Sequence, residues 1–134
     1  MAIKVLIVED SIMMQMIISE IVKSDSRFEV VATAANGKEG VDLAKQHRPD
    51  VILLDIEMPV MDGIECLKRL KMVGRFKVII LSSVAQVGSP QALKAKKLGA
   101  FDVLAKPSGA ISLDLAAKKG HVIVQSMLKA MSRT

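Results

Sequence analysis

Residues 49–65 read PDVILLDIEMPVMDGIE, and this stretch predicts the fold of the chain. Its first half, Val51 to Leu54, is apolar at every position, which is typical of a central strand in a parallel sheet that is covered on both faces. The apolar run stops at Asp55. Asp62-Gly63 then marks a turn, and a helix is predicted from about Ile64 to Met72. The stretch therefore predicts a buried strand, an acidic strand end and a helix that packs on the sheet.

The same alternation of a short β-rich run and a longer helical segment occurs five times along the chain. The predicted strands are 3–8, 29–33, 51–54, 78–81 and 103–105. The predicted helices are about 12–24, 38–47, 64–72, 90–98 and a last one ending near Met131, whose start Gly120 leaves open. The expected fold class is α/β, a flavodoxin-like, doubly wound, five-stranded parallel sheet with strand order 2-1-3-4-5 and five helices.

Length and composition predict one domain, residues 1–134, with an aliphatic core. The chain has 134 residues, of which 51% are hydrophobic but only three are aromatic, so Val, Ile, Leu, Ala and nine Met must fill the core. The single cysteine, Cys66, cannot form an internal disulfide and suits a reducing cytoplasm. We expect Cys66 to be a small core residue on a helix rather than a redox centre.

Charge and hydropathy argue against nucleic-acid and membrane partners. The net charge is +5, but Lys and Arg are scattered from Lys4 to Arg133 without interleaved aromatic residues, so we expect no nucleic-acid binding by this domain. The opening segment does not have the pattern of a signal peptide, and no stretch reaches the length of a membrane span. We therefore expect a soluble, cytoplasmic protein without membrane insertion.

Three acidic side chains follow two of the predicted strands. Glu9 and Asp10 come directly after the first strand, and Asp55 comes after the third. Ligands bind at the carboxyl edge of an open parallel sheet, and crowded carboxylates repel one another unless a cation neutralises them. Mg²⁺ prefers oxygen ligands. We predict that these three acids bind Mg²⁺, with the backbone carbonyl of Glu57 as a further ligand.

A carboxylate beside a metal that bridges a phosphate oxygen can act as a nucleophile and form an aspartyl phosphate. We predict that Asp55 is this phosphoacceptor, with Ser82 after the fourth strand as hydroxyl donor and Lys106 after the fifth as second cation. Each acid alone is more often a helix cap or a solvated loop residue, and Asp10-Ser11 is a candidate cap of the first helix. The agreement of several strand-end residues favours a phosphoryl site.

These residues closely resemble the receiver domains of two-component response regulators over essentially the whole chain. The matching stretches are VLIVEDS at 5–11, PDVILLDIEMPVMDGIE at 49–65, VIILSS at 78–83 and LGAFDVLAKP at 98–107. By position, the resemblance implies the metal-binding acid pair at Glu9 and Asp10, the phosphoacceptor at Asp55, the switch hydroxyl at Ser82, the phosphate-contacting lysine at Lys106, and the turn after the acceptor at Pro59 and Gly63.

Within this family, DIEMPVMDG, SSVAQVGSPQAL and KPSGAISLDL are most similar to the receivers of chemotaxis protein-glutamate methylesterases, the CheB family. The resemblance implies a CheA-like histidine kinase as phosphodonor, a receiver that supplies its own catalytic residues, and a methylesterase-type effector as output partner. The chain has no G-x-S-x-G nucleophile elbow, so it is not expected to hydrolyse esters. It is interpreted as the regulatory half of such a protein or as a free-standing regulator.

Some features leave alternatives open. Val103 stands where many receivers have Tyr or Phe, so we expect the signal to pass through backbone shifts around the fourth helix. Met13 and Met16, if they face outward, are candidates for kinase docking, and packing at the rim of the core is an equally good interpretation. Two other classes match part of the pattern. One is an aspartate-nucleophile phosphohydrolase, which has a second Asp where Glu57 stands, and the other is a receiver-like module that is not phosphorylated.

Overall fold

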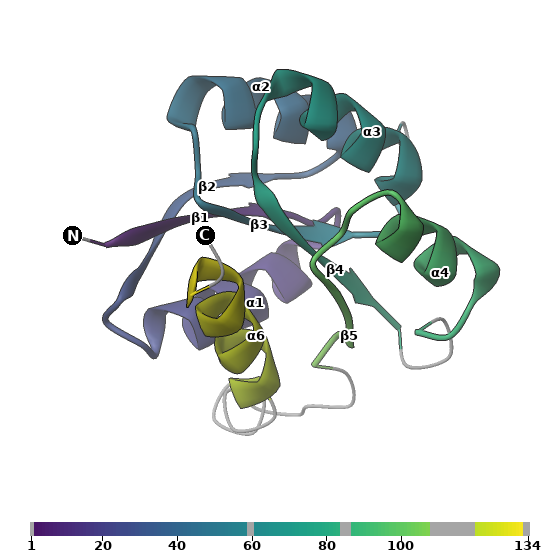
Figure 1. Cartoon of the computed structure of the whole chain (residues 1–134). Helices are drawn as coiled ribbons and strands as arrows, with labels where there is room; N and C mark the ends of the chain where they lie inside the picture. Colours follow the sequence, from purple (N-terminus) through teal and green to yellow (C-terminus); the bar gives the residue numbers. More distant parts are fainter. Residues whose placement is uncertain (1, 59–60, 84–86, 108–119, 133–134) are drawn as a thin grey trace.

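Five parallel strands form the centre of the molecule (Figure 1). The computed structural model describes residues 2–58, 61–83, 87–107 and 120–132. The strands hydrogen-bond in the order β2-β1-β3-β4-β5, which confirms the predicted topology. In chain order they are β1 (Ile3–Val8), β2 (Phe28–Ala34), β3 (Val51–Asp55), β4 (Lys77–Ser82) and β5 (Asp102–Ala105).

Helices cover both faces of the sheet. In Figure 1, α1 and α6 lie on one face, and α2 and α3 lie side by side on the other. The described residues form five helices, α1 (Ile12–Lys23), α2 (Gly37–His47), α3 (Gly63–Val73), α4 (Pro90–Lys97) and α6 (His121–Ser132). The last helix begins directly after Gly120, which confirms a predicted helix ending near Met131. None of these described helices is long and apolar enough to cross a membrane.

Alternating side chains of the strands divide the core into two layers. Leu6 and Val8 of β1 pack in the layer that contains side chains of α2 and α3, whereas Val5 and Ile7 pack with side chains of α1 and α6. All residues of β3 are buried, as expected for a strand between two others and between two layers of helices. A shift of one residue would move every side chain into the opposite layer, so the two-layer core also fixes the strand register.

Polar caps begin four of the helices. The side-chain oxygens of Ser11, Asn36, Asp62 and Ser89 each accept a hydrogen bond of 2.9 to 3.2 Å from the backbone amide three residues further on. Such caps satisfy amides that have no partner within the helix. The cap of α1 is therefore Ser11, and Asp10 is left without a capping role.

Cys66 lies in the core on α3, as predicted. Its side chain is fully buried, and its Sγ donates a hydrogen bond to the carbonyl oxygen of Gly37 at 3.6 Å. Burial, together with the nearby charge of Asp62, raises the pKa of the thiol to about 12. The thiol is therefore protonated and unreactive at neutral pH, because only the thiolate is a nucleophile.

Gly63 begins α3 directly against the end of β3. A Cβ at this position would lie 2.4 Å from the Cα of Ile56 and 2.8 Å from the carbonyl oxygen of Asp55. Both are backbone atoms, so they cannot give way without displacing the acidic strand end. The Gly63 amide also donates to the Ile56 carbonyl at 3.0 Å. Pro59, the other residue predicted for this turn, lies outside the described residues.

We expect Gly63→Ala to lower the free energy of unfolding by about 2 kcal/mol or more, because the added methyl group overlaps the backbone. The chain has no Trp or Tyr, so unfolding in urea should be followed by circular dichroism. Gly88→Ala is the matched control, because no atom lies within 4 Å of a Cβ at Gly88. Equal stabilities of the two variants would contradict the steric argument.

Candidate functional site

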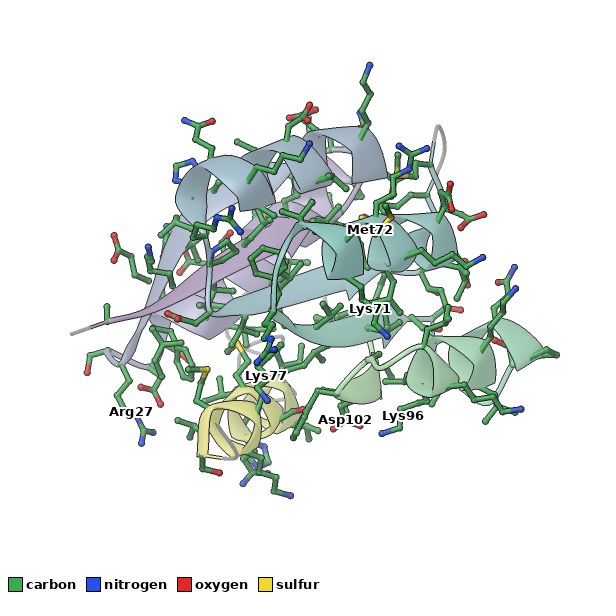
Figure 2. The ribbon with its side chains drawn as sticks, turned by 45° about the horizontal axis from the view of Figure 1, so that its top comes forward. Arg27, Lys71, Met72, Lys77, Lys96 and Asp102 are labelled. Atoms are coloured by element: carbon green, nitrogen blue, oxygen red, sulfur yellow. The ribbon has the colours of Figure 1, made fainter. Side chains whose placement is uncertain are left out.

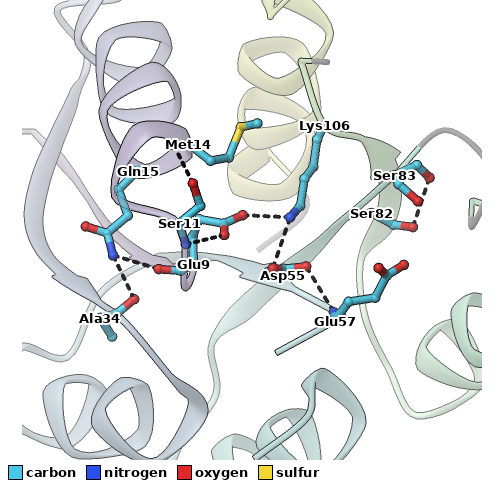
Figure 3. Close-up of polar contacts among 10 residues, drawn as sticks. All are labelled: Glu9, Ser11, Met14, Gln15, Ala34, Asp55, Glu57, Ser82, Ser83 and Lys106. Carbon is cyan, nitrogen blue, oxygen red and sulfur yellow. Dashed lines mark hydrogen bonds and ion pairs between the residues drawn. The ribbon is translucent and has the colours of Figure 1, made fainter. Parts of the chain in front are cut away.

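The side chains predicted to form a site meet at the carboxyl edge of the sheet (Figure 3). Glu9 and Asp10 follow β1, Asp55 ends β3, Ser82 ends β4, and Lys106 follows β5. They meet because the strands are parallel and because β1, β3, β4 and β5 are successive neighbours in the sheet. Glu9, Asp55 and Ser82 are buried, whereas Asp10 is exposed to solvent.

Lys106 connects the two buried carboxylates. Its Nζ lies 2.7 Å from Oε1 of Glu9 and 3.0 Å from Oδ2 of Asp55. The side chains of both acids are 1% exposed, so these ion pairs are largely shielded from water. The backbone amide of Lys106 donates to the Ser82 carbonyl at 2.7 Å, which holds the lysine at the end of β5. Loss of the lysine would leave two buried acids without their cation.

Backbone amides orient the same two carboxylates. Oε2 of Glu9 accepts a hydrogen bond from the Ser11 amide at 2.8 Å, and Oδ1 of Asp55 accepts one from the Glu57 amide at 2.9 Å. The other oxygen of each acid, Oε1 of Glu9 and Oδ2 of Asp55, has no hydrogen-bond partner of regular geometry among the described residues and contacts only the Lys106 charge. These two oxygens are therefore available to a further cation.

Burial raises the pKa of both buried acids. Desolvation raises the pKa of Glu9 to about 7, although the hydrogen bond from Lys106 acts in the opposite direction. Desolvation also raises the pKa of Asp55, against the effects of the Glu57 amide and Lys106. Burial lowers the pKa of Lys106, but its two carboxylate partners outweigh this effect and the pKa is raised overall. One lysine thus does not fully compensate the acids, and the site favours additional positive charge.

The donor set fits a hard divalent cation. One carboxylate oxygen from each of Glu9, Asp10 and Asp55 lies within 4.8 Å of the other two. Oxygens on opposite sides of one Mg²⁺ are about 4.2 Å apart, so this spacing is of the size that a single Mg²⁺ requires. All three donors are oxygens, and Oε1 of Glu9 and Oδ2 of Asp55 have the Lys106 ammonium as their one partner among the described residues. The residues present therefore fit Mg²⁺, while the carbonyl of Glu57 as a ligand stays a prediction.

The predicted switch hydroxyl belongs to Ser82, at the end of β4 next to this cluster (Figure 3). The buried hydroxyl of Ser82 donates to the carbonyl oxygen of Ser83 at 3.2 Å rather than to Asp55 (Figure 3). This distance is long for a hydroxyl donor, so the bond is weak. Val103 pairs with Ile80 on β4 and packs against the core layer of α2 and α3. The aliphatic side chain of Val103 thus occupies the position at which many receivers have Tyr or Phe.

Gln15 is a supporting residue that sequence patterns did not indicate. Its side-chain amide donates to the carbonyl oxygen of Glu9 at 2.6 Å and lies 3.5 Å from that of Ala34. It therefore holds the acidic segment after β1 against the end of β2. Glutamine is common in the first turns of helices, so the position of Gln15 one turn after the Ser11 cap indicates this supporting role only weakly.

The fold and the acidic site together define a receiver domain. A family model described as response regulator receiver domain matches residues 5–118, and the chain belongs to this family. Among its relatives, the protein-glutamate methylesterase/protein-glutamine glutaminase of Halalkalibacterium halodurans is 52% identical over 113 residues, which are 84% of this chain and 33% of that protein. The enzyme of the same name from Methanococcus maripaludis is 44% identical over 128 residues, 96% of this chain and 35% of that protein. The chain thus spans about a third of the length of these curated relatives.

Solved structures point to the same group of proteins. The response regulator domain of Thermotoga maritima CheB matches with a TM-score of 0.80 and 38% identity, over 95% of this chain and 97% of that one. The complex of the P1 domain of CheA3 with CheY6 from R. sphaeroides matches with a TM-score of 0.78 and 48% identity, over 96% of each chain. The chain is a receiver domain of the CheB-like type, which confirms the resemblance found in the sequence.

We expect Asp10→Asn to weaken Mg²⁺ binding by at least about tenfold, because it replaces one of three charged ligands by a neutral amide. Isothermal titration calorimetry measures this affinity without an intrinsic fluorophore. Asp42→Asn is the matched control, since Asp42 is an exposed acid on α2 outside the cluster. If both variants bind Mg²⁺ as tightly as the unmodified protein, Asp10 is not a ligand.

Proposed function

We propose that Asp55 accepts a phosphoryl group from the phosphohistidine of a CheA-like histidine kinase, and that Mg²⁺ is required. The observation that carries this proposal is the buried Asp55 carboxylate beside Glu9, Asp10 and Lys106. Families that transfer phosphoryl groups depend mainly on positioning and on positive charge around the transferring group. The receiver family to which the chain belongs supports the same chemistry.

In the proposed transfer, a carboxylate oxygen of Asp55 attacks the phosphorus atom, and the bond between phosphorus and the histidine nitrogen breaks. The electron pair of that bond stays on the imidazole of the kinase. Lys106, which already lies 3.0 Å from Asp55, stabilises negative charge on the transferring oxygens. Glu57 holds the attacking carboxylate through its backbone amide. When bound, Mg²⁺ supplies positive charge that offsets the three carboxylates and the phosphoryl oxygens.

The proposed switch begins at Ser82. The weak bond from its hydroxyl to Ser83 would be replaced by a bond to the phosphoryl group on Asp55, which moves the end of β4. The Ser82 carbonyl accepts a hydrogen bond from the Lys106 amide, so a displacement of the end of β4 also displaces the end of β5. Val103 on β5 has no polar side-chain group, so the proposed change passes to α4 through the backbone.

The proposed output partner is a methylesterase-type effector domain. Support comes from relatives named protein-glutamate methylesterase/protein-glutamine glutaminase, in which the region matched by this chain makes up about a third of the length. A free-standing regulator with the same switch is the second candidate. In either case the surface formed by α4, β5 and α6 changes its affinity for a partner when Asp55 is phosphorylated.

We expect incubation with acetyl phosphate and Mg²⁺ to add the mass of one phosphoryl group, because Asp55 is the acidic side chain best placed as a nucleophile. Intact-protein mass spectrometry reads the product directly. Asp55→Asn should abolish the addition, since the amide is not a nucleophile at neutral pH, and Asp42→Asn should retain it. A phosphoryl group on the Asp55→Asn protein would show that Asp55 is not the acceptor, and none on the unmodified protein would favour a receiver-like module that is not phosphorylated.

We further propose that the kinase docks on the start of α1. Ile12, Met13 and Met16 are 73%, 72% and 57% exposed, which favours the docking interpretation of the two methionines over packing at the rim of the core. They lie on the helix that follows Glu9 and Asp10, beside the site. Flexible methionine side chains suit transient interfaces.

Met13→Ser is expected to slow phosphotransfer from a CheA-like kinase by about tenfold or more, because it removes apolar contact area. Labelling by acetyl phosphate, which needs no docking surface, should be unchanged. Val122→Ser, at an exposed apolar position on α6, is the matched control. Equal slowing with both phosphodonors would show that the substitution damages the site instead of docking.

A further inference from the structure

A groove lies between α2 and α3. Its volume is about 410 Å³, and it is lined by Val41, Lys45, Arg48, Arg69, Met72 and Val73. Val41 lies near the middle of α2, and the other lining residues belong to the C-terminal halves of the two helices or directly follow α2. The helices run opposite to the strands, so the groove lies towards the edge of the sheet that is far from Asp55. It is separate from the phosphoryl site and from the α1 surface.

The groove has an apolar centre. Met72 is 87% exposed, the largest exposed fraction among the large hydrophobic residues that the structure describes (Figure 2). Val73 is partly buried and Val41 is almost fully buried, so both contribute apolar surface at the floor. A lone exposed hydrophobic residue needs no explanation, but a concave surface with a flexible methionine at its rim is typical of a site that binds an apolar side chain.

Three cations surround this apolar centre. Lys45, Arg48 and Arg69 are all exposed, and no acidic side chain is among the described residues that line the groove. Arg69 has one partner, Glu65, whose carboxylate lies 3.5 Å away one turn earlier on α3. Exposed pairs of this kind are weak, so a ligand carboxylate can replace Glu65 at little cost. The charge of the groove therefore selects for an anionic ligand.

Arg48 has an unusual backbone conformation for its residue type. Its φ of 48° is the only positive φ of a non-glycine residue in the described part of the chain. Glycine or asparagine is usual where a helix ends in this conformation. The Arg48 side chain spans from α2 to α3, where Nη1 donates to the carbonyl oxygen of Val73 at 3.0 Å. Nε and Nη2 have no partner among the described residues, so the anchored guanidinium retains donors for a carboxylate.

We propose that this groove binds an acidic amphipathic helix of a partner protein. An aliphatic side chain of that helix packs on Met72 above Val41, and carboxylates on its flanking turns pair with Lys45, Arg48 and Arg69. A second copy of this chain is a poor occupant of the groove in a symmetric contact, because it would place the same three cations against one another. Nucleic acid is disfavoured because none of the described residues that line the groove is aromatic and could stack on a base.

The probe for this proposal is a synthetic helix-forming peptide with Leu at positions i and i+4 and Glu on both flanks. Titrated into the ¹⁵N-labelled protein, it should give saturable chemical-shift changes of the amides of Val41, Met72 and Val73. A matched peptide with Lys in place of Glu should cause none. Binding should weaken as the salt concentration rises, because the pairs are exposed.

Charge reversal tests the groove itself. The double variant Lys45→Glu, Arg69→Glu should weaken peptide binding by at least about tenfold. The matched control is Lys38→Glu, Lys68→Glu, which reverses two exposed lysines on the same helices outside the groove and should bind normally. Met72→Ser should also weaken binding, whereas Leu93→Ser, at an exposed apolar position on α4, should not. Well-dispersed amide spectra of each variant verify folding.

Several outcomes would overturn the proposal. They are absence of saturable binding, shift changes centred on other helices, equal binding of the Lys peptide, and equal loss in the two charge-reversal variants. A further outcome is that the unmodified protein sediments with phosphatidylglycerol vesicles and the Met72→Ser variant does not. This result would assign the groove to a lipid surface instead. None of these readouts depends on phosphorylation of Asp55, so the test stands apart from the proposed phosphotransfer.

Discussion

The ion pairs of Lys106 with Glu9 and Asp55 are the interaction on which the site depends. They bring together three strand ends that lie far apart in the sequence and place two carboxylates where almost no water reaches them. The lysine does not offset both acids, since burial still raises the pKa of Glu9 to about 7. This residual deficit of positive charge is the physical basis for a divalent cation at the site.

The backbone around β3 holds this arrangement in place. β3 is buried along its whole length, and the Cα of Ile56 and the carbonyl of Asp55 lie against Gly63 at the start of α3. The Glu57 amide then fixes one oxygen of the Asp55 carboxylate. Asp55 thus lies at a strand end that backbone contacts hold in place, whereas the hydroxyl of Ser82 has a long hydrogen bond to Ser83. A fixed carboxylate beside a weakly bonded hydroxyl is the arrangement on which the proposed phosphoryl switch rests.

The two edges of the sheet carry different chemistry. The carboxyl edge gathers acids around one lysine, and the groove between α2 and α3 lies towards the other edge with cations around Met72. Basic residues in the last turns of α2, α3, α4 and α6 also complement the negative ends of these helices. The proposed phosphorylation and the proposed binding of an acidic helix therefore use separate groups of side chains.

Local patterns in the sequence predict the strands, the helices and the residues at the strand ends, because these features depend on periodicity and on where each apolar run stops. The strand order is predicted as part of the flavodoxin-like, doubly wound fold class that the alternation of strands and helices indicates. Other features are visible only in the tertiary structure. Lys106 contacts both buried acids at once, and Asp10 is the one exposed acid of the three. Gln15 holds the segment after β1, and Arg48 reaches across to α3. Each of these contacts depends on the register of strands and the packing of helices between residues that are distant in the chain, and no local pattern encodes those distances.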